Sequence, residues 1–325
     1  MIIVRTPLRL SFFGGGTDFA DYYNHQGGQV VSTAIDKYVY VIVKERFDDK
    51  IYVNYSQKEI VDRVDELKHE LVREAMRLTG VERGVEITTL ADVPSSGTGL
   101  GSSSSITVGV LQALYTYCGR IVEAESLARQ ACEIEIERCQ KPIGKQDQYI
   151  AAYGGLRRIR FLPNETVEAE EIRLSSSSAQ RLNRNLMLFY TNTTRAASSV
   201  LAEQQNNIPE RLAFLDALQA IAQRGAACLR QGDWDEFGRL LHENWELKKN
   251  LATGITNSQI DALYEAARRA GAVGGKIAGA GGGGFLLLYC PLDKQEAVRQ
   301  VLNHLRELPF AFERDGSKVI FNIRR

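Results

Sequence analysis

The segment PSSGTGLGSSSS (residues 94–105) constrains the fold of this chain more than any other stretch. The alternating residues GVEITTL (84–90) before it predict a strand, and the apolar run ITVGVLQALYTYCG (106–119) after it predicts a helix. Glycines lose much conformational entropy on folding, so their number at one strand-to-helix junction needs a physical reason. The first N–H groups of a helix lack internal partners and attract anions. The junction therefore predicts a phosphate-binding loop rather than a flexible surface segment.

Two common nucleotide-binding motifs are absent from the sequence. The P-loop motif GxxxxGK[ST] requires a lysine, which residues 94–105 lack, and the GGK at 274–276 is followed by Ile277. The stretch GAGGGG (279–284) has the letters of the dinucleotide fingerprint, but it leads into the strand-like run FLLLYC (285–290) instead of a helix. The phosphate loop therefore belongs to another class.

Composition excludes several other kinds of protein. The 325 residues include 40 Lys+Arg and 40 Asp+Glu, so the formal net charge of zero gives no sign of nucleic-acid binding. The five cysteines form no CxxC pair, which favours reduced thiols. The longest apolar runs, such as YVYVIV (38–43), are too short to span a membrane. We expect a soluble cytoplasmic protein with no nucleic-acid or membrane partner.

Hydrophobic periodicity divides the chain into two halves. The first mixes strands and helices, and the second contains several long helices. We place a boundary near 160–185 and predict domains at 1–170 and 171–325. The predicted strands cover 2–8, 38–45, 51–56, 84–90 and 184–191, a strand–turn–strand at 271–290 and a final strand pair around 310–321; the predicted helices cover 58–80, 106–119, 123–139, 197–206, 209–231, 233–251, 257–270 and 293–306.

Three separated motifs carry a family resemblance. They are RTPLRLSFFGGGTDFADYYNHQGG (5–28), the serine-rich loop (94–105) and GGKIAGAGGGGFLLL (274–288). In order, spacing and content they closely resemble the three signature motifs of the GHMP kinases, the family of galactokinase, homoserine kinase and mevalonate kinase. The resemblance covers nearly the whole chain. It implies a two-lobed α+β fold, with a ribosomal-protein-S5-like N-terminal lobe and a ferredoxin-like C-terminal lobe, and it implies ATP and Mg²⁺ as cofactors.

Details of the first motif point to one branch of that family. Where galactokinases and mevalonate kinases usually have GEH, this chain has Gly14, Gly15 and Gly16 before Thr17 and Asp18. This departure, with IGKQDQYIAAYGGL at 143–156, resembles sugar 1-kinases of the D-glycero-D-manno-heptose 7-phosphate kinase type. The resemblance implies phosphorylation of the anomeric hydroxyl of that sugar phosphate to the 1,7-bisphosphate. Such a product would feed nucleotide-activated heptose for surface polysaccharide.

The resemblance also assigns catalytic residues. Asp147 matches the family's catalytic aspartate, which would accept the proton of the attacking sugar hydroxyl. Arg9 matches the basic residue of the first motif and would steady the attacking oxygen and the transferring phosphoryl group. A solvated turn carboxylate and a strand-end ion pair are the alternatives for these two residues.

The resemblance assigns the serine-rich loop to ATP and the metal. Ser103 and Glu137 are chosen as Mg²⁺ ligands, because Mg²⁺ takes few protein oxygens and several waters, while Glu133 and Glu135 compete with Glu137. The predicted ATP-binding residues are Pro94, Ser96, Gly97, Gly99, Leu100, Gly101, Ser102, Ser103 and Ser104.

A third group of residues is assigned to the substrate. Asp18 would accept hydrogen bonds from sugar hydroxyls, and Arg195 would bind the 7-phosphate, although a polar helix cap explains the residues around Arg195 equally well. The last glycine motif would brace the phosphate loop and line the cleft. The predicted substrate-binding residues are Gly14, Gly15, Gly16, Thr17, Asp18, Arg195, Gly281 and Gly282.

Three alternatives to the heptose assignment stay open. A fucokinase-like enzyme would act on an unphosphorylated sugar. An ATP-dependent decarboxylase of the family is disfavoured by the sugar-kinase-like motifs. A catalytically silent sugar sensor could keep the fold and lose the chemistry, and the presence of Asp147, Glu137 and the serine loop disfavours it. A homodimer is left open as the assembly.

Overall fold

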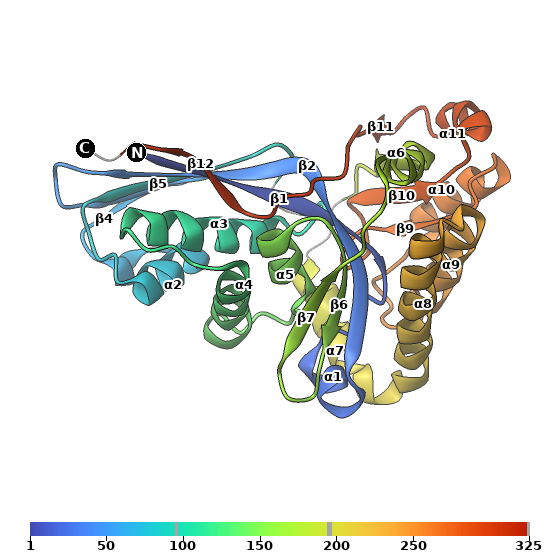
Figure 1. Ribbon diagram of the computed structural model, residues 1–325, viewed down its shortest axis with the longest axis horizontal. Helices are drawn as coiled ribbons and strands as arrows, with labels where there is room; N and C mark the ends of the chain where they lie inside the picture. The colour runs from blue at the N-terminus through green and yellow to red at the C-terminus, as the bar shows by residue number, and fades with distance from the viewer. Residues whose placement is uncertain (95–96, 194–196, 324–325) are drawn as a thin grey trace.

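The computed structural model describes residues 1–94, 97–193 and 197–323, and two β-sheets organise this part of the chain (Figure 1). The larger sheet runs in the order β12-β1-β2-β5-β3-β4, with β6 paired to β2 and β7 to β6; the smaller runs β11-β8-β10-β9. The larger sheet contains β1 (Ile2–Phe13), β2 (Gly28–Glu45), β3 (Ile51–Asn54), β4 (Lys58–Val61), β5 (Val85–Ala91), β6 (Leu156–Phe161), β7 (Val167–Glu171) and β12 (Lys318–Asn322), and the smaller contains β8 (Leu186–Tyr190), β9 (Gly274–Ile277), β10 (Phe285–Tyr289) and β11 (Arg306–Glu307).

Helices cover the sheets and join them. In the larger sheet α3 packs on β1 and β2, and α2 packs on α3; in the other half α8 and α9 pack together, α8 against β2 and α9 against β9 (Figure 1). The predicted α+β class is confirmed. The helices are α1 (Ala20–Gln26), α2 (Glu70–Thr79), α3 (Ser102–Tyr117), α4 (Ala124–Cys132), the π-helix η2 (Glu133–Arg138), α5 (Gln146–Tyr153), α6 (Ser176–Asn185), α7 (Ala197–Asn206), α8 (Leu212–Gln231), α9 (Trp234–Lys248), α10 (Ser258–Arg269) and α11 (Gln295–Val301).

A bulge in β2 shifts the pairing of β1 with β2 ahead of the part of the first motif that reaches the cleft. The register between β1 and β2 shifts after Pro7, whose nitrogen cannot donate to the ladder. Beyond the bulge, β1 pairs with the part of β2 that also pairs with β6. The backbone N–H of Arg9 donates to the Leu100 carbonyl at 3.0 Å. This hydrogen bond ties the strand to the serine-rich loop.

Some predicted elements are wrong in extent. The helix expected over 58–80 begins only at Glu70, because residues 58–61 form the edge strand β4 against β3, and Glu59 accepts hydrogen bonds from the backbone N–H groups of Lys68 and His69. The expected terminal strand pair is replaced by β12, which pairs with β1. In both places pairing with a distant strand overrides the local pattern.

The predicted domain boundary between residues 170 and 171 stays a prediction. It falls inside β7, and β12 crosses from the second half of the sequence back to the larger sheet. Two clusters of buried apolar residues accompany the two sheets, and the first also draws in side chains of α8 and α9. No helix in residues 1–94, 97–193 or 197–323 has the length and apolar character needed to cross a membrane.

The contact between α8 and β1 generates a stability prediction. A Cβ added at Gly225 of α8 would lie 2.4 Å from Cδ2 of the buried Phe13 ring. We expect Gly225→Val to lower the free energy of unfolding by about 1–3 kcal/mol, because the core has no room for the added atoms. Urea unfolding measures the change. The exposed neighbour provides the control: Gln223→Ala should leave the transition unchanged, and equal stability of the two variants would contradict the close packing.

Candidate active site

The three glycine-containing motifs line one cleft. The first contributes Arg9 and Asp18, the serine-rich loop contributes residues 97–104, and the third contributes Gly279 and Ala280. The start of α5 completes the wall. The cleft therefore lies where the larger sheet, the start of α3 and the glycine turn at 279–284 meet.

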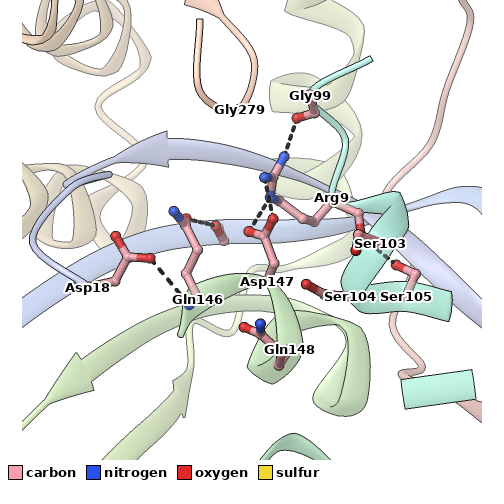
Figure 2. A network of polar contacts seen from close by, with 12 residues as sticks. Arg9, Asp18, Gly99, Ser103, Ser104, Ser105, Gln146, Asp147, Gln148 and Gly279 are labelled. Atoms are coloured by element: carbon pink, nitrogen blue, oxygen red, sulfur yellow. Dashed lines mark hydrogen bonds and ion pairs between the residues drawn. The ribbon is translucent and has the colours of Figure 1, made fainter. Parts of the chain in front are cut away.

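The centre of the cleft is a buried ion pair. Arg9 is 5% exposed, and its Nε and Nη2 donate to Oδ1 and Oδ2 of Asp147 at 2.7 and 2.6 Å (Figure 2). The third branch of the guanidinium, Nη1, donates to the Gly99 carbonyl. Such a two-pronged pair fixes both planes, so Asp147 faces the cleft in one orientation. The structure brings these two predicted residues together.

The serine-rich loop ends at the N-terminus of α3 without a side-chain cap. Gly101 precedes the helix at φ +78, and a Cβ there would lie 3.1 Å from Arg9 Cγ and 3.3 Å from Asp147 Oδ2. The hydroxyl of Ser102 is buried and has no hydrogen-bond partner among the described residues. The first N–H groups of a helix have no intrahelical partner, and together with the unpartnered hydroxyl they suit a phosphate.

The structure places Glu137, predicted as a metal ligand, with its side chain exposed on η2. The glutamate that meets the serine-rich loop is Glu135. It is fully buried, its two carboxylate oxygens accept from Ser103 Oγ at 2.8 Å and Ser104 Oγ at 2.7 Å, and Oε2 also accepts from Gln148 Nε2 at 2.6 Å. The buried residues Leu127, Ala128 and Ala131 of α4 predict this register, since the same helical face continues to Glu135.

The carboxylate and hydroxyl oxygens at Glu135 and the serines are suitable ligands for a Mg²⁺ ion. Burial raises the pKa of this carboxyl, and Lys141 Nζ lies 4.0 Å from its Oε1. One carboxylate and the serine hydroxyls are the oxygen ligands that Mg²⁺ takes when phosphates and waters supply the rest. The described residues contain no group of three or more His, Cys, Asp or Glu side chains that could hold a metal. An ion here would therefore rest on Glu135 and Ser103 together with a bound phosphate.

The first motif divides into cleft residues and structural residues. Asp18 is 3% exposed, accepts from the backbone N–H groups of Gly16 at 3.0 Å and Gln146 at 3.3 Å, and has a pKa raised by burial. Thr17 is not available to substrate, because its hydroxyl is engaged with the Gly14 and Gln29 carbonyls.

Glycines allow the first motif to pack so closely. Gly15 and Gly16 line the cleft, whereas Gly14 packs against the Gln29 carbonyl and is a turn residue rather than a substrate contact. A Cβ at Gly144 would lie 2.0 Å from Oδ2 of Asp18. Only glycine at position 144 leaves room for that carboxylate.

The third glycine motif packs directly against the serine-rich loop. A Cβ at Gly99 would lie 2.2 Å from the Ala278 carbonyl, and one at Gly279 would lie 2.6 Å from the Gly99 Cα. The cleft residues of this motif are Gly279 and Ala280. Gly281 and Gly282, predicted as substrate contacts, instead pack on the Ile255 carbonyl, which accepts from the Gly282 N–H at 2.8 Å.

The remaining predicted residues divide between the wall of the cleft and positions outside it. Gly97, Leu100 and Ser104 line the cleft. Pro94 is exposed and is not among its lining residues. Ser96 and Arg195 lie outside the described residues, so the predicted 7-phosphate contact stays a prediction.

Sequence reasoning missed two buried lysines near the ion pair. Lys248 is 4% exposed and lines the cleft, and Lys276 is 1% exposed and donates to the Phe12 carbonyl at 3.4 Å. Burial lowers the pKa of both amines, that of Lys248 to about 8. One signal existed in the sequence: Lys248 continues the helical stripe of Leu241 and Trp245, where a charged residue is unexpected.

Comparison with known proteins places this arrangement among kinases. Residues 59–155 match the family described as GHMP kinases N terminal domain, and residues 226–308 match GHMP kinases C terminal. The D-glycero-alpha-D-manno-heptose 7-phosphate kinase of Campylobacter jejuni is 30% identical over 98% of each chain. The L-fucokinase/L-fucose-1-P guanylyltransferase of Bacteroides fragilis is 28% identical over 91% of this chain and 35% of its own length. The crystal structure of a D-glycero-D-manno-heptose 1-phosphate kinase from Bacteroides thetaiotaomicron has a TM-score of 0.84 at 26% identity, covering all of both chains.

The geometry around Glu135 generates a metal-binding prediction. We expect Glu135→Gln to weaken binding of ADP in the presence of Mg²⁺ by on the order of tenfold or more, because a neutral amide is a poor ligand for a hard cation. Titration calorimetry with and without Mg²⁺ isolates the metal-dependent part. Glu137→Gln on the exposed side of the same π-helix is the matched control and should bind as the unaltered protein does. The opposite ranking of the two variants would restore Glu137 as the ligand.

Proposed function

The chain belongs to the GHMP kinase family and is an ATP-dependent carbohydrate kinase of the heptose kinase branch, and from that premise we propose its sugar substrate and mechanism. The proposed reaction transfers the γ-phosphoryl group of ATP to the anomeric hydroxyl of D-glycero-D-manno-heptose 7-phosphate. The product is the 1,7-bisphosphate. In the proposed role it supplies nucleotide-activated heptose for surface polysaccharide.

One observation carries the choice of sugar. The likeness to the C. jejuni heptose 7-phosphate kinase extends over 98% of both chains, so it includes the first motif as well as the nucleotide loop. The triplet Gly14–Gly16 stands where bulkier residues are usual in galactokinases, and Gly15 and Gly16 line the cleft next to Asp18. A Cβ at Gly14 or Gly16 would collide with neighbouring protein atoms, whereas one at Gly15 would meet no atom nearer than 3.8 Å, so Gly15 is the glycine with open space beside it.

The proposed chemistry uses the central ion pair. The anomeric oxygen attacks the γ-phosphorus, the bond from that phosphorus to the ADP oxygen breaks, and the hydroxyl proton passes to Asp147. Arg9 holds both carboxylate oxygens of Asp147, so it orients the acceptor of the proton. Its positive charge also stabilises negative charge on the phosphoryl oxygens. An anomeric hydroxyl is more acidic than an ordinary alcohol, which suits a base with a bound guanidinium.

ATP phosphates are proposed to lie at the start of α3. The N–H groups there and the unpartnered Ser102 hydroxyl would hold them, and the Gly101 backbone brings them next to Arg9 and Asp147. Mg²⁺ bound at Ser103 and Glu135 would neutralise phosphate charge when present. Asp18 accepts two backbone N–H groups and keeps lone pairs for sugar hydroxyls.

A fucokinase-like activity is the second candidate. The B. fragilis L-fucokinase shares 28% identity over 91% of this chain, and an unphosphorylated sugar needs no second anion site. The two heptose kinase relatives also differ in the phosphate position that their names print, 7-phosphate in one and 1-phosphate in the other. The position of the new phosphate is therefore part of the test.

An ADP-release assay with Mg·ATP tests the substrate. The panel contains D-glycero-D-manno-heptose 7-phosphate, fucose, mannose, galactose, mevalonate and homoserine. We expect turnover with the heptose 7-phosphate alone, and a phosphorus NMR signal for a new anomeric phosphate. Turnover with fucose but not with the phosphosugar would replace the heptose proposal with the fucokinase one. Nucleotide and sugar binding without turnover on any acceptor would support the silent sensor.

The Asp147→Asn variant tests the proton acceptor. We expect kcat to fall by about 10²- to 10⁴-fold with little change in nucleotide affinity, because the amide cannot take the proton. Asp235→Asn, an exposed acid on α9, is the control and should keep full activity. A loss of less than tenfold in Asp147→Asn would assign Asp147 to orienting Arg9 only.

A further inference from the structure

Lys248 is a buried cation for which the proposed mechanism has no use. It is the last residue of α9, and its side chain is 4% exposed although it lines the cleft. Among the described residues its Nζ has one hydrogen-bond partner, the Gly279 carbonyl. An ammonium has three N–H donors, and leaving donors of a buried charge unpaired is costly. The remaining N–H donors of the Lys248 ammonium are therefore available to a ligand in the cleft.

The contacts of Lys248 mirror those of Arg9. Arg9 donates to the Gly99 carbonyl, Lys248 donates to the Gly279 carbonyl, and the Gly99 and Gly279 backbones pack against each other (Figure 2 shows the two glycines facing). Arg9 therefore binds one of the two glycine loops and Lys248 binds the other, at the point where the loops touch. Both side chains line the cleft that contains Ser102.

The charges of this region favour an anion. The buried cations Arg9, Lys248 and Lys276 stand against the carboxylates of Asp18 and Asp147. Burial, followed by repulsion from Arg9, lowers the pKa of Lys248 to about 8, although Asp18 and Asp147 raise it. An arriving anion would satisfy the free donors and stabilise the ammonium.

We propose that Lys248 is a catalytic residue that binds the phosphoryl group of ATP during its transfer, as a second cation beside Arg9. Its neighbours Arg9 and Asp147 belong to the reacting end of the cleft, whereas the 7-phosphate lies at the far end of the sugar from the anomeric hydroxyl. The inference rests on ATP as phosphoryl donor and on the proposed position of Asp147. It does not depend on which sugar is the acceptor. Charge on the phosphoryl oxygens is what a second cation stabilises.

The decisive measurement compares nucleotides with and without a γ-phosphate. Dissociation constants of Mg·ADP and of the Mg complex of a non-hydrolysable ATP analogue are measured without sugar for Lys248→Met and for the control Lys249→Met. Lys249 is the next residue, and its partner is Glu246 at the surface. We expect Lys248→Met to lose about 10- to 100-fold in affinity for the ATP analogue relative to ADP. The control should keep the original ratio.

Turnover supplies the second readout. We expect kcat of Lys248→Met to fall by about 100-fold on whichever sugar the unaltered enzyme accepts. Lys248→Arg, which keeps the charge, should recover part of the preference for the ATP analogue. Equal weakening of ADP and the analogue would overturn the proposal and leave Lys248 as a structural clamp on Gly279. Because these binding measurements contain no sugar, failure of the heptose assignment cannot be mistaken for failure of this proposal.

A measurement on the unaltered enzyme keeps the proposal testable if the variants do not fold. The groups facing Lys248 are Arg9, Asp18, Asp147 and the neighbouring Lys276. The free amine loses its proton as pH rises through about 8, and a bound γ-phosphate raises its pKa, so binding takes up a proton above that pH. We expect the affinity ratio of ATP analogue to ADP to fall between pH 7 and 9.5. A ratio that stays constant over this range would contradict the role of Lys248.

Discussion

The buried guanidinium of Arg9 is the interaction on which the rest of the site depends. Its side chain reaches Asp147 on α5 and the Gly99 carbonyl in the serine-rich loop, and its backbone reaches Leu100. A buried charge deprived of its partners costs several kcal/mol. The strand, the loop and the helix are therefore held in one arrangement, and the candidate base and the candidate phosphate site are brought together by the same side chain.

Glycine makes this convergence sterically feasible. The start of α3 lies on the Arg9–Asp147 pair because Gly101 has no Cβ, and the two glycine loops touch backbone to backbone at Gly99 and Gly279. This close approach admits Lys248 from the second half of the chain to the cleft. In the proposed mechanism, activity depends on charged side chains from both halves of the chain, which meet where the Gly99 and Gly279 backbones leave no room for side chains.

The sequence predicted the framework well and the assignment of individual side chains less well. The three motifs do line one cleft, and the strand–loop–helix around residues 94–105 is confirmed outside its undescribed pair. The stretch EIEIER (133–138) did not reveal which glutamate meets the serines. Its glutamates alternate with isoleucines, and this alternation does not show which of them continues the buried face of α4. Thr17 and Gly281 lie in two of the three family-like motifs, but neither faces a substrate. The Thr17 hydroxyl donates to the Gly14 carbonyl, and Gly281 packs against the Ile255 carbonyl.

By itself the sequence determined the α+β class and the strand–glycine loop–helix around residues 94–105, because turn chemistry and hydrophobic periodicity act through neighbouring residues. The resemblance of its three motifs to those of the GHMP kinases identified the family. Only the tertiary structure decided that Glu135 rather than Glu137 meets the serines, and that Lys248 enters the cleft. Burial and charge pairing depend on contacts between distant segments: Arg9 and Asp147 are 138 positions apart, and Lys248 and Gly279 are 31 apart. No local pattern contains these contacts, since each pair meets only when segments distant in the sequence fold onto one another.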